Sequence, residues 1–227
     1  MTHTFVSVTE ALAVIGGFSA PSKMPGYSWS LSAKICQVGS KLREIPGSTC
    51  STCYALKGNY NFSNVTAAHA RRLSALDNPL FEEAFVFALL ETYRRTRATY
   101  VRRGKEIQEN RFRWFDAGDI QSLEMLEMIN RIALATPKLR HWLPTRELEY
   151  ARQFKAKHPE GFAKNLIVRP STPMISDRFK NQPMGLPFST VDRVDKDIKA
   201  CPAGSQGNQC LNCDTCWTNK NVSYASH

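Results

Sequence analysis

Four cysteines near the end of the chain have the type and spacing of a metal site. Cys201, Cys210, Cys213 and Cys216 follow the pattern C-P-x7-C-x2-C-x2-C. Zinc sites usually combine CxxC pairs from separate segments or include histidine, whereas three cysteines at two-residue spacing suit the corners of a 4Fe-4S cluster, as in bacterial ferredoxins. We therefore expect an iron–sulfur cluster here, with zinc or unligated thiols as the alternatives.

Three further cysteines, Cys36, Cys50 and Cys53, form a second group without an evident fourth ligand. Ligation by three cysteines would leave one iron open to substrate, solvent or a cofactor, and an open position is what catalytic metal sites keep. Two alternatives stand beside a second cluster. Cys36 could be a core residue beside an incidental CxxC, or Cys50 and Cys53 could share one site with the C-terminal cysteines.

Polar side chains follow the expected strands of the sheet. Asp116 and Asp119 come after the second strand, Arg146 after the third and Arg169 after the fourth. Ligands of parallel α/β sheets bind at the carboxyl ends of the strands, and arginine binds carboxylate or phosphate with a pair of parallel hydrogen bonds. We predict these four residues as catalytic candidates that hold a small anionic ligand above the open iron. The alternatives are helix caps, as for Asp119, or surface ion pairs.

Two aromatic residues directly follow cysteines of the two groups. Tyr54 comes after Cys53, and Trp217 comes after Cys216. Shielding a cluster from solvent changes its reduction potential. We therefore expect both rings to cover the bound metal.

Strand-like and helix-like patterns alternate through the middle of the chain. The expected strands are Tyr27–Ile35, Arg111–Ala117, His141–Thr145, Leu166–Val168 and Thr190–Val194, and the expected helices are Val8–Ile15, Phe62–Leu76, Leu80–Arg103, Gln121–Ala135 and Glu147–Lys157, with a loop over Gly39–Thr52. This alternation predicts βα units with a parallel sheet. The strands are too few for an eight-stranded barrel. The fold class expected is therefore α/β, a partial or open (β/α) barrel with a cysteine-rich C-terminal tail.

The size of the chain fits one domain. Its 227 residues, 42% of them hydrophobic, suffice for a single core. We expect residues 1–200 to form one α/β domain and residues 201–227 to form a cluster-binding segment packed on it. No stretch approaches about 20 apolar residues, and no basic region marks a secretory signal. These features predict a cytoplasmic protein without a membrane partner, in which cysteines serve as ligands rather than in disulfides.

The chain is basic, with 30 Lys plus Arg against 20 Asp plus Glu, a formal charge of +10. Such a charge attracts nucleic acid or acidic ligands, or else merely skews a soluble surface. A dense run is expected to form the solvated face and end of one helix, comprising Arg94, Arg95, Arg97, Arg102, Arg103, Lys105, Arg111 and Arg113. It lacks the interleaved aromatics of a single-strand groove. The sequence gives no indication of the oligomeric state.

Four blocks of sequence together resemble the bacteriophage gene product 88-like proteins. They are G-S-T-C-S-T-C-Y-A (Gly47–Ala55), W-F-D-A-G-D-I-Q-S (Trp114–Ser122), W-L-P-T-R-E (Trp142–Glu147) and the terminal C-P-A-G…C-x2-C-x2-C-W. The resemblance implies a phage-encoded, metal-containing protein located in the cytoplasm of the host cell.

A more distant likeness is to radical S-adenosylmethionine enzymes. Those carry three cysteines after the first strand of a partial barrel, often with Tyr after the last one, as in Cys53-Tyr54. They also carry a Gly-Gly-Glu-like turn, whose place Ala117-Gly118-Asp119 would take. The likeness implies S-adenosylmethionine as a cofactor and Gly118 as a cofactor-binding residue. The chain departs from it in the long spacer, x13, between Cys36 and Cys50.

Four functions fit these residues. The preferred one is an enzyme whose open iron acts as a Lewis acid in hydrolysis or dehydration. The others are a radical S-adenosylmethionine-type enzyme, an electron-transfer protein, and a non-catalytic protein that is stapled by clusters and binds a host protein or nucleic acid.

Overall fold

A four-stranded parallel sheet forms the centre of the molecule. The computed structural model describes residues 5–103 and 110–226. The strands pair in chain order, β1-β2-β3-β4, and every pair is parallel. Their bounds are β1 (Tyr27–Trp29), β2 (Arg111–Trp114), β3 (Arg140–Thr145) and β4 (Leu166–Pro170). The predicted α/β class with a parallel sheet is therefore confirmed.

A second parallel sheet of three short strands was not predicted as such. Its order is β5-β7-β6, from β5 (Ser189–Val191), β6 (Ile198–Ala200) and β7 (Asn221–Tyr224). The expected strand at Thr190–Val194 overlaps β5, while β6 and β7 show no alternation long enough to predict a strand. A parallel bridge between Ser171 and Ser189 joins the second sheet to the end of β4.

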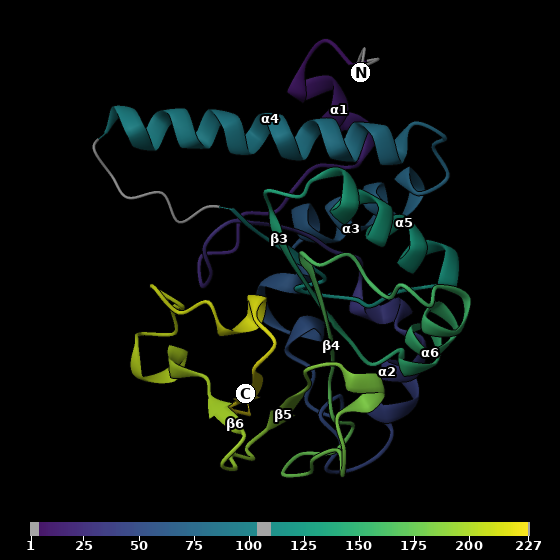
Figure 1. Cartoon of the computed structure of the whole chain (residues 1–227), viewed down its shortest axis with the longest axis vertical. Coiled ribbons are helices and arrows are strands. Elements are labelled where there is room, and N and C mark those ends of the chain that lie inside the picture. Colours follow the sequence, from purple (N-terminus) through teal and green to yellow (C-terminus); the bar gives the residue numbers. More distant parts are fainter. Residues whose placement is uncertain (1–4, 104–109, 227) are drawn as a thin grey trace.

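Six α-helices connect or precede the strands (Figure 1). They are α1 (Val8–Val14), α2 (Gln37–Arg43), α3 (Ser63–Ala75), α4 (Phe81–Arg102), α5 (Leu123–Ala135) and α6 (Leu148–Lys157). Short 3-10 turns lie next to cysteines or in the connecting segments, at η1 (Ala33–Ile35), η2 (Tyr54–Leu56), η3 (Gly58–Asn61), η4 (Pro183–Gly185), η5 (Pro202–Ser205) and η6 (Thr215–Trp217). The helices predicted from apolar periodicity lie within one or two residues of α1, α3, α4, α5 and α6.

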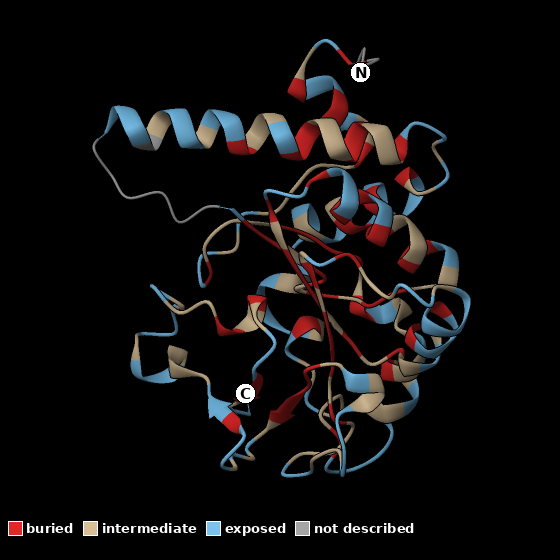
Figure 2. Cartoon of the chain, in the orientation of Figure 1, coloured by how far each residue is buried: buried red, intermediate tan, exposed pale blue. Residues whose placement is uncertain are grey.

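One face of the main sheet carries the hydrophobic core. Phe112, Trp114, Leu143 and Val168 pack against apolar residues of α1, α4, α5 and α6. Phe85 of α4 stacks on Trp114, with ring centroids 4.7 Å apart. Figure 2 shows the buried residues concentrated along the strands and the helix faces toward them. Burial of such side chains, at roughly 1.5–3 kcal/mol each, fixes the helices on this face.

The first expected strand is shorter than the alternation suggested. The pattern over Tyr27–Ile35 predicted one strand, yet pairing ends at Trp29 and the chain turns into η1. The hydroxyl of Ser32 accepts a hydrogen bond from the backbone N–H of Lys34 (3.3 Å) and so caps a helical turn. Capping by Ser32 outweighs the continued alternation. The loop predicted over Gly39–Thr52 is wrong in its first part, because α2 occupies Gln37–Arg43.

The basic run divides between two elements, which corrects the prediction of one solvated helix. Arg94, Arg95, Arg97 and Arg102 lie on α4 and Arg103 directly follows it; the far half of this helix extends past the other helices in Figure 1 and is largely exposed in Figure 2. Arg111 and Arg113 instead lie in β2. Lys105 lies outside the described residues.

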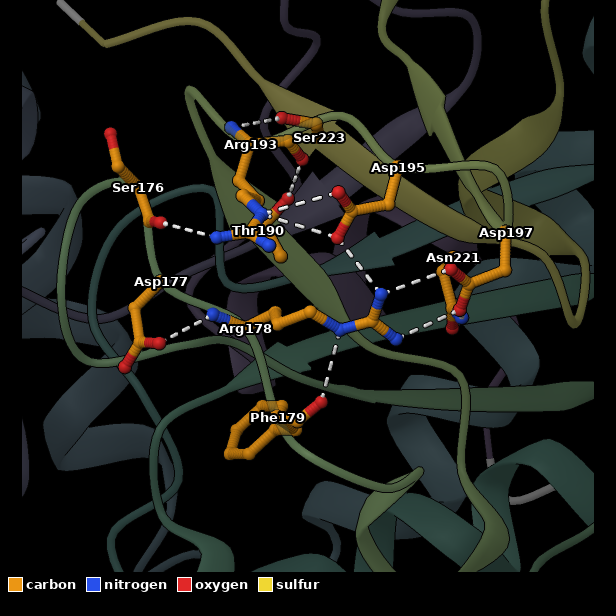
Figure 3. Close-up of polar contacts among 10 residues, drawn as sticks. All are labelled: Ser176, Asp177, Arg178, Phe179, Thr190, Arg193, Asp195, Asp197, Asn221 and Ser223. Atoms are coloured by element: carbon orange, nitrogen blue, oxygen red, sulfur yellow. Dashed lines mark hydrogen bonds and ion pairs between the residues drawn. The ribbon is translucent and has the colours of Figure 1, made fainter.

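A charged network holds the loop that follows β4 against the second sheet (Figure 3). The Arg178 guanidinium donates to Asp195 (2.8 Å) and Asp197 (3.1 Å), and Arg193 Nε donates to Asp195 (3.1 Å). These groups are open to solvent, so their ion pairs add little to stability and mainly fix the path of the loop.

His141 is a neutral core histidine. Trp114 Nε1 donates to its Nδ1 (3.3 Å), so the proton sits on Nε2, which contacts the Thr136 hydroxyl (2.8 Å). That hydroxyl donates in turn to the Ile132 carbonyl (2.7 Å). Burial lowers the pKa of His141 from 6.5 to about 3.

We expect His141 to make the protein less stable in acid. Between pH 6.5 and about 3, His141 binds a proton in the unfolded chain but stays neutral in the folded chain. The free energy of unfolding therefore falls as the pH falls. The slope from this group is at most about 1.4 kcal/mol per pH unit. Urea unfolding of wild type and His141→Gln between pH 7 and 4, at matched metal content, measures it. Equal pH slopes in the two proteins would contradict the assignment.

Candidate metal centre

The first cysteine group lies at the carboxyl edge of the main sheet. Cys36 ends η1 and precedes α2, while Cys50 and Cys53 precede η2. Gly39 of α2 lies between two of the sulfurs. A Cβ placed on it would stand 3.0 Å from the Cys36 Cβ and 3.7 Å from the Sγ atoms of both Cys36 and Cys50. Only glycine leaves this space open.

The thiols of this group influence one another. Burial, and after it the charges of Asp119, Cys53 and Cys50, raises the pKa of Cys36 to about 12. Burial also raises the pKa of Cys50, which the nearby Arg146 charge opposes. Three mutually close thiols that resist ionisation form a site that a cation would stabilise.

Asp119 also lies at this carboxyl edge of the main sheet, here called the rim, on the loop after β2. Its carboxylate accepts hydrogen bonds from the Thr145 hydroxyl (2.7 Å), the Arg146 N–H (2.8 Å) and the Ile120 N–H (2.8 Å). Burial nevertheless raises the pKa of Asp119 to about 6, against the effect of these donors. Capping of α5 is done by Ser122, which accepts from Met125 N (3.2 Å). The capping alternative for Asp119 is therefore wrong.

The loop after β3 contributes Arg146 and Glu147. Arg146 donates to the carbonyls of Ser171 and Thr172, which follow β4. Glu147 is buried and accepts from the Val38 N–H of α2 (2.8 Å). These contacts bind the ends of β3 and β4 to the first cysteine group. Like Arg146, Glu147 follows the end of β3, the position at which ligand-binding side chains of parallel sheets are expected.

Asp116 lies near these residues but is enclosed by hydroxyl groups. Ser28 donates to it (2.9 Å), as do Ser30 through a short contact and Tyr60 (3.1 Å). Burial opposes its ionisation, but the Arg113 charge and the three hydroxyls hold the pKa of Asp116 below its usual range. Asp116 is thus a permanent carboxylate next to the rim.

Gly118 has a backbone role at this rim. Its φ is +79°, and a Cβ on it would lie 2.7 Å from the Leu31 carbonyl oxygen. The loop after β2 can therefore approach the segment after β1 only with glycine here. This close approach places Asp116 and Asp119 beside the segment that leads to Cys36.

The C-terminal cysteines gather on the opposite face of the sheet from the helices. Burial and the charges of Cys201 and Cys213 raise the pKa of Cys210. Burial raises the pKa of Cys216 to about 11, and the Tyr224 hydroxyl, 3.2 Å from its sulfur, opposes this. The four cysteines predicted as one group therefore lie together.

Trp217 anchors this segment to the sheet. Its Nε1 donates to the Phe112 carbonyl (3.0 Å), and its ring packs edge-on against Trp142 at 5.3 Å. Tyr54, by contrast, is 41% exposed, and its hydroxyl donates to the Asp116 carbonyl (2.7 Å). The structure thus buries one of the two aromatic residues and leaves the other at the surface.

The sheet face under the C-terminal cysteines is lined by arginine. The strand register places on it Arg111 beside Arg140, Arg113 beside Trp142, and Arg169 beside Pro144. Of seven buried side-chain polar atoms without a partner among the described residues, five belong to this face. They are the Nε atoms of Arg111, Arg113, Arg140 and Arg169 and the Nε1 of Trp142. Buried donors without partners indicate a missing anionic or acceptor group.

Arg169 lies beneath the C-terminal segment, away from the rim. Its fully buried guanidinium donates to five carbonyls, those of Phe188, Thr215, Cys216, Thr218 and Lys220, at 2.7 to 3.4 Å. The structure thus brings Asp119 and Arg146 to the first cysteine group, with Asp116 nearby, and places Arg169 with the second group.

All seven cysteines are free thiols. Within residues 5–103 and 110–226, no three His, Cys, Asp or Glu side chains are arranged to hold a single metal ion. A four-iron cluster is larger than one ion, and its thiolates stand further apart.

The Gly39→Ala variant tests the first group. Alanine usually stabilises a helix by about 1 kcal/mol relative to glycine, but here its methyl group enters the space between Cys36 and Cys50. We expect the variant to lose the metal of the first group while α2 stays folded, measured as metal content and circular dichroism. Gly204→Ala, with no atom within 4 Å of its Cβ, is the matched control. Full metal content in Gly39→Ala would contradict a site between these sulfurs.

No helix in the described part of the chain is long and apolar enough to cross a bilayer. A family model described as gene product 88 matches residues 6–219. This match gives no support to the likeness with radical S-adenosylmethionine enzymes. No curated protein and no solved structure matches the chain.

Proposed function

The chain belongs to the gene product 88 family, and on this premise we propose that it is a phage-encoded iron–sulfur protein with two clusters. Cys201, Cys210, Cys213 and Cys216 would hold one cluster, and Cys36, Cys50 and Cys53 the other. The host cytoplasm, which is reducing, suits seven free thiols. We also propose that the four βα-type strands form part of a (β/α) barrel with the cysteine-rich tail on its inner face.

One observation carries the proposal, the set of unpartnered arginine donors behind the C-terminal cysteines. A cluster ligated by thiolates is anionic, and its sulfides accept N–H hydrogen bonds, which tune its potential. Arg111 already donates to the Cys213 carbonyl (3.3 Å), and the charges of Arg113 and Arg169 lower the pKa of Cys216. The residues present therefore fit the group in both charge and donor chemistry.

The first group supports an enzymatic role. When bound there, a cluster held by three thiolates would supply a Lewis-acidic iron. Asp119 has a pKa near 6 and can hold or release a proton at neutral pH. Arg146 opposes the rise that burial causes in the pKa of Cys50, and it adds positive charge at the rim, where a small anionic ligand would bind. Hydrolysis or dehydration needs a Lewis acid, a group that transfers a proton and a charge that binds the substrate. Arg169 lies with the other cysteine group and acts as a positioning residue for the tail.

Iron and sulfide content, with the electron paramagnetic resonance spectrum of protein purified without oxygen, tests the proposal. Two clusters require about eight irons and eight sulfides per chain. About four irons would reduce the proposal to one cluster. Zinc without sulfide would overturn it.

The Asp119→Asn variant tests the enzymatic part. We expect unchanged iron and sulfide, because Asp119 is not a proposed ligand. Citrate serves as the small anionic probe: we expect it to change the spectrum of the reduced wild type and to leave that of Asp119→Asn unchanged. Ser122→Ala, which alters the nearby α5 cap instead, should keep the citrate response. A normal citrate response in Asp119→Asn would remove this carboxylate from ligand binding.

Three alternatives keep the clusters but change their use. A radical enzyme would cleave S-adenosylmethionine once reduced, and an electron-transfer protein would respond to neither that compound nor citrate. Nucleic-acid binding is favoured by the end of α4, where Arg97 on the helix and Arg103 just after it are exposed and have no acidic partner among the described residues. Backbone binding would weaken steeply with salt.

A further inference from the structure

Arg113 of β2 lies between the two cysteine groups. Its guanidinium carbon stands 4.5 Å from the centre of the Trp142 ring, and its buried Nε has no partner in the described structure. Trp142 packs in turn on Trp217, the residue after Cys216. Arg113 is therefore held in a fixed position by an aromatic layer that belongs to the C-terminal side.

The opposite end of the guanidinium faces the first group. Arg113 Nη2 donates to the Tyr54 hydroxyl (3.4 Å), and Tyr54 directly follows Cys53. The same hydroxyl donates to the Asp116 carbonyl at the rim (2.7 Å). One hydrogen bond thus connects Arg113 to the turn that carries Cys53.

The charge of Arg113 also reaches the second group. On the same sheet face, the neighbouring Arg111 donates to the Cys213 carbonyl (3.3 Å), and Arg113 packs on Trp142, which contacts Trp217 directly after Cys216. Burial works against the charge of Arg113 itself, but Tyr54, Asp116 and Tyr224 raise its pKa, so the guanidinium stays protonated. The protonated Arg113 guanidinium therefore contacts residues beside both cysteine groups.

We propose that Arg113 is a shared tuning residue, whose single guanidinium sets the reduction potential of the metal bound at both cysteine groups. The inference rests on the proposed function. Each cluster takes up one electron from a reductant such as dithionite, gains one negative charge and exchanges no proton. A nearby cation stabilises the more negative product, so removing Arg113 lowers both potentials.

Redox titration with dithionite, followed by electron paramagnetic resonance, tests the inference on the full chain. In Arg113→Met we expect the reduction equilibrium of both clusters to fall about tenfold, which is 59 mV for one electron. Arg140→Met is the matched control, because Arg140 lies on the same face but pairs with Asp214 (3.0 Å). It should shift the C-terminal cluster alone. A chain with Cys50→Ala and Cys53→Ala identifies which signal is C-terminal.

Tyr54→Phe gives a second readout if Arg113→Met fails to fold. Removing the Tyr54 hydroxyl breaks the contact on the first side, so only the first cluster should shift. Normal iron with an unshifted first cluster in either variant would overturn the shared role and leave the proposed function standing. Protein without iron and sulfide would overturn the proposed function itself.

Discussion

Cys213→Ala protein purified without oxygen should contain about half the iron and sulfide of wild type, because one of the two proposed clusters loses a ligand. The same variant should unfold more easily. Metal binding contributes to folding in small metal loops, and this loop joins β6 to β7 in the second sheet. We expect a loss of about 3 kcal/mol or more, a fall of roughly 6–12 °C in the midpoint of thermal unfolding.

Ser205→Ala is a suitable control for Cys213→Ala. Ser205 lies in the same loop and bonds only locally, to the Pro202 carbonyl (2.9 Å). It should keep full iron and nearly full stability. Iron at the wild-type level in Cys213→Ala would remove this cysteine from the ligand set, and loss of all the iron would show that both groups serve one cluster.

Arg169→Met should be among the most destabilising substitutions in the chain. The guanidinium is fully buried, and its removal leaves several of five carbonyls without a donor. Buried unpaired groups cost about 1–3 kcal/mol each, so we expect a loss on the order of 4 kcal/mol. Urea unfolding of the variant measures it. Arg169→Lys should recover only part, because an ammonium cannot span carbonyls on both sides.

Arg178→Met is the matched control for Arg169→Met. Arg178 also makes several hydrogen bonds, to Asp195 and Asp197 (Figure 3), but its side chain is 30% exposed, whereas Arg169 is fully buried. Its replacement should change stability far less than that of Arg169. Equal losses in the two variants would show that burial of the Arg169 guanidinium does not set its contribution.

Much of the main sheet could be predicted from periodicity. Runs such as Gln121–Ala135 have an apolar stripe that must face a core, and α5 lies within that range. The placement of Asp119 and Arg146 near Cys36 followed from a single rule, that parallel strands end at one edge. Neither inference needed knowledge of distant contacts.

The features that could not be predicted depend on tertiary contacts. Arg111 and Arg113 follow a basic helix in the sequence and were counted with it, although their alternation with Phe112 and Trp114 fits a strand with two different faces. Arg169 was expected at the rim because it stands near the end of β4. Its true surroundings are set by the tail, and nothing in the sequence near β4 shows where the tail docks.

The position of β7 also sets an order for assembly. β7 lies between β5 and β6 and is the only strand that both of them pair with in the described sheet. During synthesis β5 and β6 cannot pair until β7 has been translated. Cys36, Cys50 and Cys53, by contrast, are translated before most of the chain. Translation adds about 5–20 residues per second, starting from the N-terminus. The last cysteines are thus fixed in place only after β7 has been made, so the C-terminal centre would mature after translation of this region, as its closing step.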